Sequence, residues 1–176
     1  MVLKLMNKLF EINATDEDLM NIGVKLGADV PYCIKGGTAL CEGIGEKITE
    51  LKPFKGNILI LVKPPFSVST KEVYKAFEIE KARIHPSTQL LIKAMEEDDL
   101  KFIATNMKNL LENVTIRNNR SILVIKEKMI ELGALGSMMS GSGPSVFGFF
   151  DDMFKAQKCY DEMKKKYKDV FITRTI

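Results

Sequence analysis

Two apolar runs constrain the fold of this 176-residue chain more than any other feature of its sequence. The runs are Ile58–Val62 and Val146–Phe150, and each has the length of a buried strand. Neither approaches the roughly 18–20 residues that a helix needs to cross a bilayer. Much of the remaining chain has apolar residues at helical spacing. The sequence therefore predicts a globular fold in which buried strands are interleaved with helices.

Composition excludes several classes of protein. Hydrophobic residues make up 45% and charged residues 28% of the chain, which excludes a disordered, fibrous or collagen-like protein. The 26 basic and 23 acidic residues leave a formal net charge of only +3. This balance gives no reason to expect nucleic acid or a membrane as a partner. A chain of this size buries roughly two thirds of its unfolded surface, so its core needs no metal or disulfide.

Cysteine and histidine usage narrows the chemistry. Cys33, Cys41 and Cys159 are odd in number and lack C-x-x-C spacing, which argues against disulfides and a zinc site and favours a reducing, cytoplasmic compartment. The first 13 residues lack the pattern of a signal peptide. His85 is the single histidine, so a multi-histidine metal site is excluded. The base of an enzyme would more naturally be a carboxylate or a lysine.

The remaining patterns predict a two-layer α+β fold with a mostly antiparallel sheet packed on helices. Thr15 and Asp18 have the spacing of a capping box, and Gly27 is placed to end that helix. The proline at position 31 predicts an extended chain over 29–31. We expect helices over residues 2–10, 15–27, 70–77, 87–97, 98–113, 121–132 and 154–167, and strands over 38–42, 46–51, 57–63, 134–139, 145–150 and 170–176.

A glycine-rich segment between two predicted strands is the first candidate site. Gly141 and Gly143 flank Ser142, and glycine permits positive φ and close approach of the backbone to a ligand. Successive N–H groups there could form an anion-binding nest, to which Ser140 and Ser145 would add hydroxyls. The plainer alternative is an ordinary hairpin turn. The segment is not a Walker A motif, because no Gly-Lys-Ser/Thr follows.

Asp29, within Gly27–Pro31, is the second candidate. We expect it to lie in fixed, half-buried backbone, where its carboxylate could accept a proton from a substrate hydroxyl. The alternative is an aspartate that bonds nearby N–H groups of the turn. The third candidate is Ser67–Thr70, whose hydroxyls could hold a substrate, or which could be a loop in which Thr70 caps a helix.

These motifs occur in an order that resembles the galactokinase, homoserine kinase, mevalonate kinase and phosphomevalonate kinase (GHMP) superfamily. The resemblance covers essentially the whole chain and favours a branch that acts on a methylerythritol derivative in the non-mevalonate isoprenoid pathway. The motifs are Gly27–Pro31, Gly43–Glu46, a strand that ends at Lys63 and Pro64, Ser69–Tyr74, and Met139–Phe147.

The resemblance implies ATP-dependent phosphoryl transfer to a hydroxyl of the methylerythritol moiety, with Mg²⁺ bridging the phosphates. Asp29 matches the catalytic aspartate, which accepts the hydroxyl proton or orients the oxygen. Thr70 matches a substrate-binding position. Ser140–Ser145, with Gly141, Ser142 and Gly143, matches the motif that approaches the nucleotide. No residue of this chain is implied as a metal ligand.

The chain departs from the family pattern at its start. The substrate-binding lysine and asparagine of the family, its glycine-rich phosphate loop and an assignable catalytic lysine have no match here. Val2–Phe10 matches the helix after that loop. We therefore expect the C-terminal three fifths of a kinase, inactive alone. Residues 1–56 would be a remnant of the N-terminal, S5-like ATP-binding domain, and 57–176 the ferredoxin-like C-terminal domain.

Two alternatives stay open at this point. The chain could be a non-catalytic, stand-alone domain with a kinase-derived fold that binds or self-associates, because the face left by the missing part would be apolar. It could also come from another branch of the superfamily that acts on mevalonate or homoserine.

Overall fold

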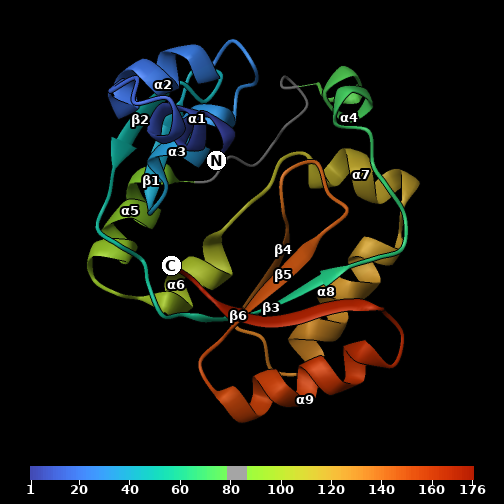
Figure 1. Cartoon of the computed structure of the whole chain (residues 1–176). Helices are drawn as coiled ribbons and strands as arrows, with labels where there is room; N and C mark the ends of the chain where they lie inside the picture. The colour runs from blue at the N-terminus through green and yellow to red at the C-terminus, as the bar shows by residue number, and fades with distance from the viewer. Residues whose placement is uncertain (79–86) are drawn as a thin grey trace. The chain divides into compact units, whose positions relative to one another are not determined.

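The computed structural model describes residues 1–78 and 87–176, so His85 lies outside the described residues. The chain forms two compact units, Met1–Phe54 with Ile176, and Lys55–Thr175 (Figure 1). Each unit is described by itself. In the described part of the chain, none of the helices combines the length and apolar character that a membrane span requires.

The first unit contains three short helices and a hairpin. The helices are α1 (Val2–Leu9), α2 (Asp16–Gly23) and α3 (Val30–Lys35), and β1 (Ala39–Glu42) pairs antiparallel with β2 (Lys47–Glu50). The predicted capping box is confirmed. Thr15 Oγ1 accepts from the Asp18 N–H at 3.1 Å, and Asp18 Oδ2 accepts from the Thr15 N–H at 2.9 Å. The Asp18 carboxylate accepts hydrogen bonds from the Thr15 hydroxyl and N–H, and these bonds lower the pKa of Asp18.

Two expectations for this unit are wrong. The helix that begins at Asp16 ends at Gly23, well before Gly27. The chain then enters α3 at Val30, where extended backbone was expected. Pro31 fits there because it lies in the first turn of α3, where the missing N–H has no intrahelical partner to lose. Gly23 permits the close packing of α2 on α3, since a Cβ there would lie 2.8 Å from Val30 Cγ1.

The core of the first unit is small. Its buried apolar side chains include Leu19, Ile34 and Phe54, whereas α1 buries none of its residues. Leu5 and Leu9 of α1 are more than half exposed. Much of the apolar surface of this unit therefore remains in contact with solvent.

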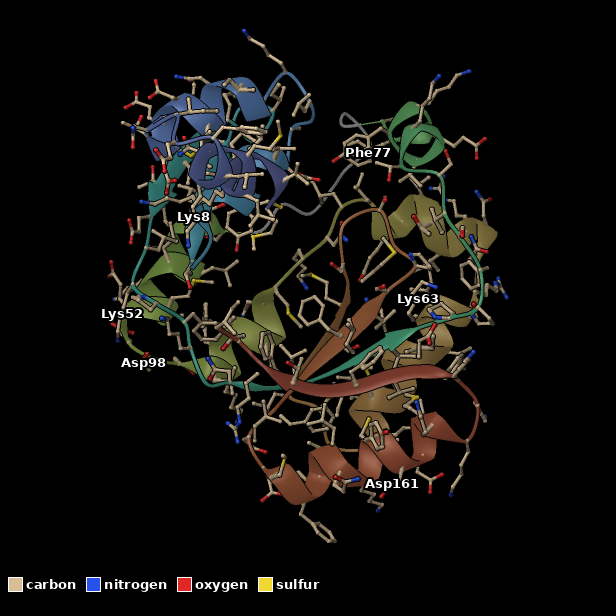
Figure 2. All side chains as sticks on the ribbon, in the orientation of Figure 1. Lys8, Lys52, Lys63, Phe77, Asp98 and Asp161 are labelled. Carbon is tan, nitrogen blue, oxygen red and sulfur yellow. The ribbon has the colours of Figure 1, made fainter. Side chains whose placement is uncertain are left out.

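The second unit is built on a four-stranded antiparallel sheet, in the order β4-β5-β3-β6. Its strands are β3 (Ile58–Lys63), β4 (Gly136–Met139), β5 (Val146–Phe150) and β6 (Asp169–Arg174). The two apolar runs of the sequence are thus adjacent strands, with Ile60 opposite Gly148. Lys63 is the last residue of β3 (Figure 2). Its ammonium group forms an ion pair of 3.9 Å with Asp169, the first residue of β6.

Two helices, α8 (Ser121–Glu131) and α9 (Met153–Lys164), form the second layer of this unit. α8 packs on β4 and β5, and α9 packs on β3 and β6 (Figure 1). The predicted two-layer α+β fold is confirmed. The core between sheet and helices consists of Ile60, Val62, Ile122, Ile125, Met129, Ala134, Met139, Val146, Phe150, Ala156, Cys159, Met163 and Val170.

The helix predicted over residues 98–113 is wrong as a single element. The chain instead forms α6 (Leu100–Asn106), a break, and α7 (Glu112–Asn118). Asp99 caps α6 by accepting from the Phe102 N–H at 2.9 Å. Two further helices, α4 (Thr70–Ala76) and α5 (Thr88–Glu96), match their predictions closely. The break matters for the site, because it places the side chain of Asn109 beside the glycine-rich segment.

Candidate active site

The glycine-rich segment forms the turn between β4 and β5. The Ser140 N–H donates to the Ser145 carbonyl at 2.8 Å, and the Gly143 N–H donates to the Ser140 carbonyl at 2.9 Å. Gly141 has a φ of +55° and Gly143 a φ of +88°. A Cβ at Gly143 would lie 2.6 Å from Met139 Sδ, so this position requires glycine for space and for conformation.

The outer edge of this turn is open to a ligand. Ser140 and Gly141 are exposed, and a Cβ at Gly141 would meet no atom within 4 Å. Within residues 1–78 and 87–176, the N–H groups of Gly141 and Ser142 donate to no protein acceptor. Two successive amides without an internal partner have the chemistry of an anion nest. The turn is therefore both the hairpin that the sequence allowed and a suitable place for an anion.

Thr70 lies against this turn, 72 residues away in sequence. The hydroxyl oxygens of Thr70 and Ser142 are 2.9 Å apart. The expectation that Thr70 caps α4 is wrong, because Ser69 does so and accepts from the Glu72 N–H at 3.3 Å. The side chain of Thr70 is thereby left for the contact with Ser142. The structure thus brings together two residues that the sequence singled out separately.

A cavity of about 220 Å³ lies between α4 and α7. Ser67 and Ser69 line it on one side, and Asn118 and Asn119 line it on the other. The hydroxyls and amides of these side chains can hold a polar molecule by hydrogen bonds. The third candidate segment of the sequence therefore lies at a polar cavity, although Ser69 also serves as a cap.

Asp29 lies in the first unit, as the residue before α3. It is exposed, so the expectation of a half-buried carboxylate is wrong. Its side chain forms no capping hydrogen bond with α3, which argues against a purely local role in the turn. The charge of Asp29 acts on Cys41 of β1. The pKa of Cys41 is raised, mainly because the thiol is partly buried and to a lesser extent because of the charge of Asp29.

The tip of the β1–β2 hairpin packs on the turn that carries Asp29. Gly45 has a φ of +120°, and a Cβ there would lie 2.8 Å from the Ala28 carbonyl oxygen. The tip is itself fixed by Glu46, whose Oε2 accepts from the Ile44 N–H at 2.7 Å. Hydrogen bonds from the N–H groups of Glu46 itself and of Ile44 lower the pKa of Glu46. The backbone before Asp29 is therefore braced by a glycine-dependent contact.

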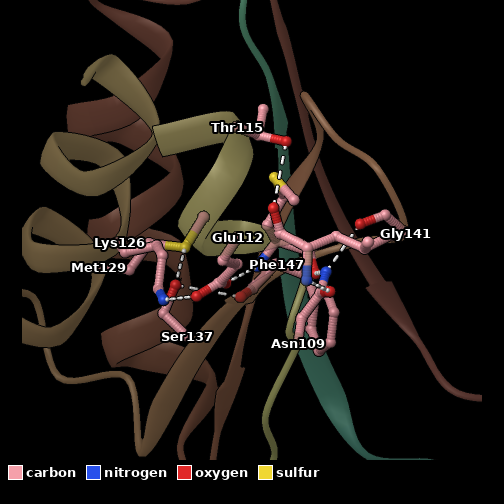
Figure 3. Close-up of polar contacts among 10 residues, drawn as sticks. Asn109, Glu112, Thr115, Lys126, Met129, Ser137, Gly141 and Phe147 are labelled. Carbon is pink, nitrogen blue, oxygen red and sulfur yellow. Dashed lines mark hydrogen bonds and ion pairs between the residues drawn. The ribbon is translucent and has the colours of Figure 1, made fainter. Parts of the chain in front are cut away.

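Three residues that hold the glycine turn on its protein side were not predicted from the sequence. Thr115 of α7 is buried, and its hydroxyl donates to the Ser142 carbonyl at 3.1 Å. Asn109 and Glu112 bond the backbone at Met139 and Gly141 (Figure 3). Such residues carry no short motif, and the spacing around them favoured one unbroken helix. In the described ranges, no group of three His, Cys, Asp or Glu side chains could hold a metal ion.

Comparison with known protein families and curated sequences finds similarity to kinases. Residues 91–169 match the family model described as "GHMP kinases C terminal". The chain is 70% identical, over 99% of its length, to a protein of Clostridium beijerinckii named 4-diphosphocytidyl-2-C-methyl-D-erythritol kinase. It is 68% identical to a protein of the same name from Clostridium botulinum Alaska E43. The chain spans 62% of the length of each of these relatives.

Solved structures share the fold. The crystal structure of a 4-(cytidine 5'-diphospho)-2C-methyl-D-erythritol kinase matches 98% of this chain and 61% of its own, with a TM-score of 0.79 and 23% identity. A homoserine kinase from Cytophaga hutchinsonii matches 97% of this chain and 61% of its own, with a TM-score of 0.75 and 20% identity. At these identities the likeness establishes the fold alone.

Proposed function

We propose that this chain is part of a kinase, on the premise that its residues 91–169 match the family model described as "GHMP kinases C terminal". The whole protein would transfer the terminal phosphoryl group of ATP to a hydroxyl of 4-diphosphocytidyl-2-C-methyl-D-erythritol, as the names of its relatives suggest. The observation that carries the proposal is the open glycine turn, whose two unbonded amides lie next to the paired hydroxyls of Thr70 and Ser142.

Each candidate residue has a role in this reaction. The substrate oxygen attacks the terminal phosphorus of ATP, the bond from that phosphorus to the bridging oxygen breaks, and ADP leaves. The carboxylate of Asp29 accepts the hydroxyl proton or orients the oxygen, and its exposure leaves it accessible to a substrate. The N–H groups of Gly141 and Ser142 approach the nucleotide phosphates, and Thr70 contacts the substrate.

Magnesium accompanies ATP in this proposal and would neutralise charge on the phosphates. Magnesium in such sites is held by one or two carboxylates together with the phosphates of the substrate. We assign no residue of this chain as a metal ligand. The roles of Asp29, Thr70 and the glycine turn do not depend on such a ligand.

The length of the chain bears on where the activity resides. We propose that the chain is the C-terminal portion of a longer kinase, since it spans 62% of its relatives. Residues 1–56 would then belong to the ATP-binding domain and residues 57–176 to the C-terminal domain. The relatives carry further residues, among which the phosphate loop is expected, so the 176-residue chain alone should be inactive. A cytoplasmic location fits three free cysteines.

A second candidate function is self-association of a non-catalytic domain. The observation that favours it is α1, which buries none of its residues and exposes Leu5, Leu9 and Phe10. Exposed apolar patches of this kind promote association. Sedimentation of the 176-residue chain tests this candidate, because a monomer at micromolar concentration would exclude it.

The kinase proposal is tested in a completed protein. We define this as the present chain joined to the residues that its Clostridium beijerinckii relative has in addition. The completed protein should release ADP in the presence of ATP and 4-diphosphocytidyl-2-C-methyl-D-erythritol. Asp29→Asn should lower kcat by about 10²–10⁴-fold, because the amide cannot accept a proton.

A matched control uses an aspartate outside the candidate site. Asp161 is an exposed residue of α9, bonded at 3.0 Å by Gln157 (Figure 2). Asp161→Asn should leave kcat unchanged. Equal kcat for the Asp29 and Asp161 variants would remove Asp29 from its role. Phosphorylation of mevalonate or homoserine in place of the methylerythritol compound would reassign the substrate.

A further inference from the structure

At the β4 edge of the sheet, side chains rather than another strand form hydrogen bonds with the backbone. Among the described strands, β4 is an outer one and pairs with β5 alone. In this antiparallel pair the Ser140 N–H bonds the Ser145 carbonyl at 2.8 Å. Because inward and outward backbone groups alternate along a strand, the preceding residue, Met139, directs its N–H and carbonyl away from β5. These outward groups belong to the residue just before the glycine turn.

Two side chains from the segment around the start of α7 satisfy both outward groups of Met139. Glu112 Oε1 accepts from the Met139 N–H at 2.5 Å. Asn109 Nδ2 donates to the Met139 carbonyl at 2.8 Å. Together they provide one acceptor and one donor, as a neighbouring strand would. Asn109 Nδ2 also donates to the Gly141 carbonyl at 2.7 Å, so the same amide reaches into the turn itself (Figure 3).

Each side chain of this pair is itself held in place. Glu112 is 13% exposed, and its second oxygen pairs with Lys126 of α8 at 2.5 Å. The ion pair balances the charge of the partly buried carboxylate and fixes its direction. Asn109 Oδ1 accepts from the Leu111 N–H at 3.0 Å, which sets the orientation of its amide. Thr115, one turn after Leu111, adds the bond to the Ser142 carbonyl at 3.1 Å.

We propose that Asn109 and Glu112 are positioning residues that fix the glycine turn in the shape required for phosphoryl transfer. The carbonyls of Met139, Gly141 and Ser142 are all engaged on the protein side. Within the described residues, the amides of Gly141 and Ser142 have no protein acceptor. The Gly141 carbonyl, held by Asn109, shares its peptide plane with the Ser142 N–H, and the Ser140 carbonyl, held by the Gly143 N–H, shares its plane with the Gly141 N–H. Fixing these carbonyls therefore fixes the direction of the two free N–H groups. This inference rests on the proposed kinase function.

The first arm of the test uses the 176-residue chain and needs no activity. Asn109→Asp keeps the shape of the side chain but places a carboxylate against two carbonyl oxygens. We expect faster amide hydrogen exchange at Ser140 and Gly143, the two hydrogen-bonded amides of the turn, with unchanged exchange in β3 and β5. Asn113→Asp is the matched control, because Asn113 is an exposed asparagine of α7, four residues after Asn109. Unchanged exchange in the turn of Asn109→Asp would overturn the proposal.

The second arm uses the completed protein. Asn109→Asp should lower kcat/KM for ATP by about tenfold to a hundredfold, as a displacement of about 1 Å can do, and should leave KM for the alcohol substrate unchanged. Glu112→Ala should show a similar loss, and Glu112→Gln should recover most of it because an amide oxygen can still accept from Met139. A normal kcat/KM for ATP in Asn109→Asp would overturn the positioning role.

The two arms separate this inference from the kinase proposal. A completed protein without any kinase activity contradicts the proposed function, while the exchange arm still shows whether Asn109 holds the turn. An active protein in which Asn109→Asp loosens the turn but leaves kcat/KM for ATP unchanged contradicts the inference alone. An equal loss of kcat/KM in the Asn113→Asp control would also contradict it.

Discussion

The two units of the chain hold their candidate residues in different ways. The second unit fixes the glycine turn with the side chains of Asn109, Glu112 and Thr115, above a core of thirteen buried residues. The first unit carries Asp29 on an exposed turn, braced by Gly45 against Ala28. The difference indicates that the shape of the turn is built into the second unit. The position of Asp29 depends instead on a small, sparsely buried unit.

The largest expected effect lies in the core of the second unit. Phe150 is 1% exposed, and Phe150→Ala should lower the free energy of unfolding of that unit by about 3–5 kcal/mol. Leu19→Ala, in the small core of the first unit, should cost about 2 kcal/mol, at the low end for such substitutions. Amide hydrogen exchange measures both effects unit by unit. A larger loss for Leu19→Ala would break the comparison.

Alanine substitutions at two glycines of the second unit distinguish the cost of overpacking from the cost of a positive φ. A Cβ at Gly136 would lie 1.8 Å from the carbonyl oxygen of Ala104, a backbone atom of α6. Gly136→Ala should therefore cost about 3 kcal/mol or more in urea unfolding, as overpacking does. Gly141→Ala meets no atom but must adopt a φ of +55°, and it should cost about 1–2 kcal/mol. Equal free-energy costs for the two variants would show that α6 moves away from residue 136 to accommodate the added methyl group.

A smaller effect is expected at the cap of α2 in the first unit. Thr15→Ala removes the acceptor for the Asp18 N–H and should cost about 1 kcal/mol, seen as faster amide exchange in α2 alone. Exchange that also rises in β3 or β5 would contradict the separation into two units.

The same cap predicts a dependence on pH. The folded pKa of Asp18 is lowered by Thr15, so the stabilisation is present above the unfolded pKa and is lost as the pH falls below about 4. Relative to the intrinsic rate at each pH, amide exchange in α2 should therefore rise in acid for the wild type. This relative rate should rise much less for Thr15→Ala, and an equal rise in both proteins would contradict the cap.

The smallest expected effect concerns the thiols. Burial raises the pKa of Cys159 to about 11, so this thiol should react with iodoacetamide only when the second unit opens. Cys33 and Cys41 of the first unit are exposed and should react in the native protein. Asp29→Asn removes the lesser of two causes that raise the pKa of Cys41, so it should speed alkylation of Cys41 and leave Cys33 unchanged. An unchanged alkylation rate at Cys41 would show that the charge of Asp29 does not act on this thiol.

The sequence predicted the parts of this structure that local patterns determine. The strands at Ile58 and Val146, the cap at Thr15 and the glycine turn all follow from the residues themselves. The break after α6 and the first turn of α3 did not, because the side chain of Asn109 and the packing of Val30 on Gly23 act across the chain. The contact of Thr70 with Ser142 joins distant segments, which no local pattern encodes.

The most direct test of the account measures phosphoryl transfer by two proteins side by side. The completed protein and the 176-residue chain are each incubated with labelled ATP and 4-diphosphocytidyl-2-C-methyl-D-erythritol, and the labelled product is quantified. We predict steady turnover by the completed protein and none above background by the 176-residue chain. Robust turnover by the 176-residue chain alone, or none by a folded completed protein, would contradict the account.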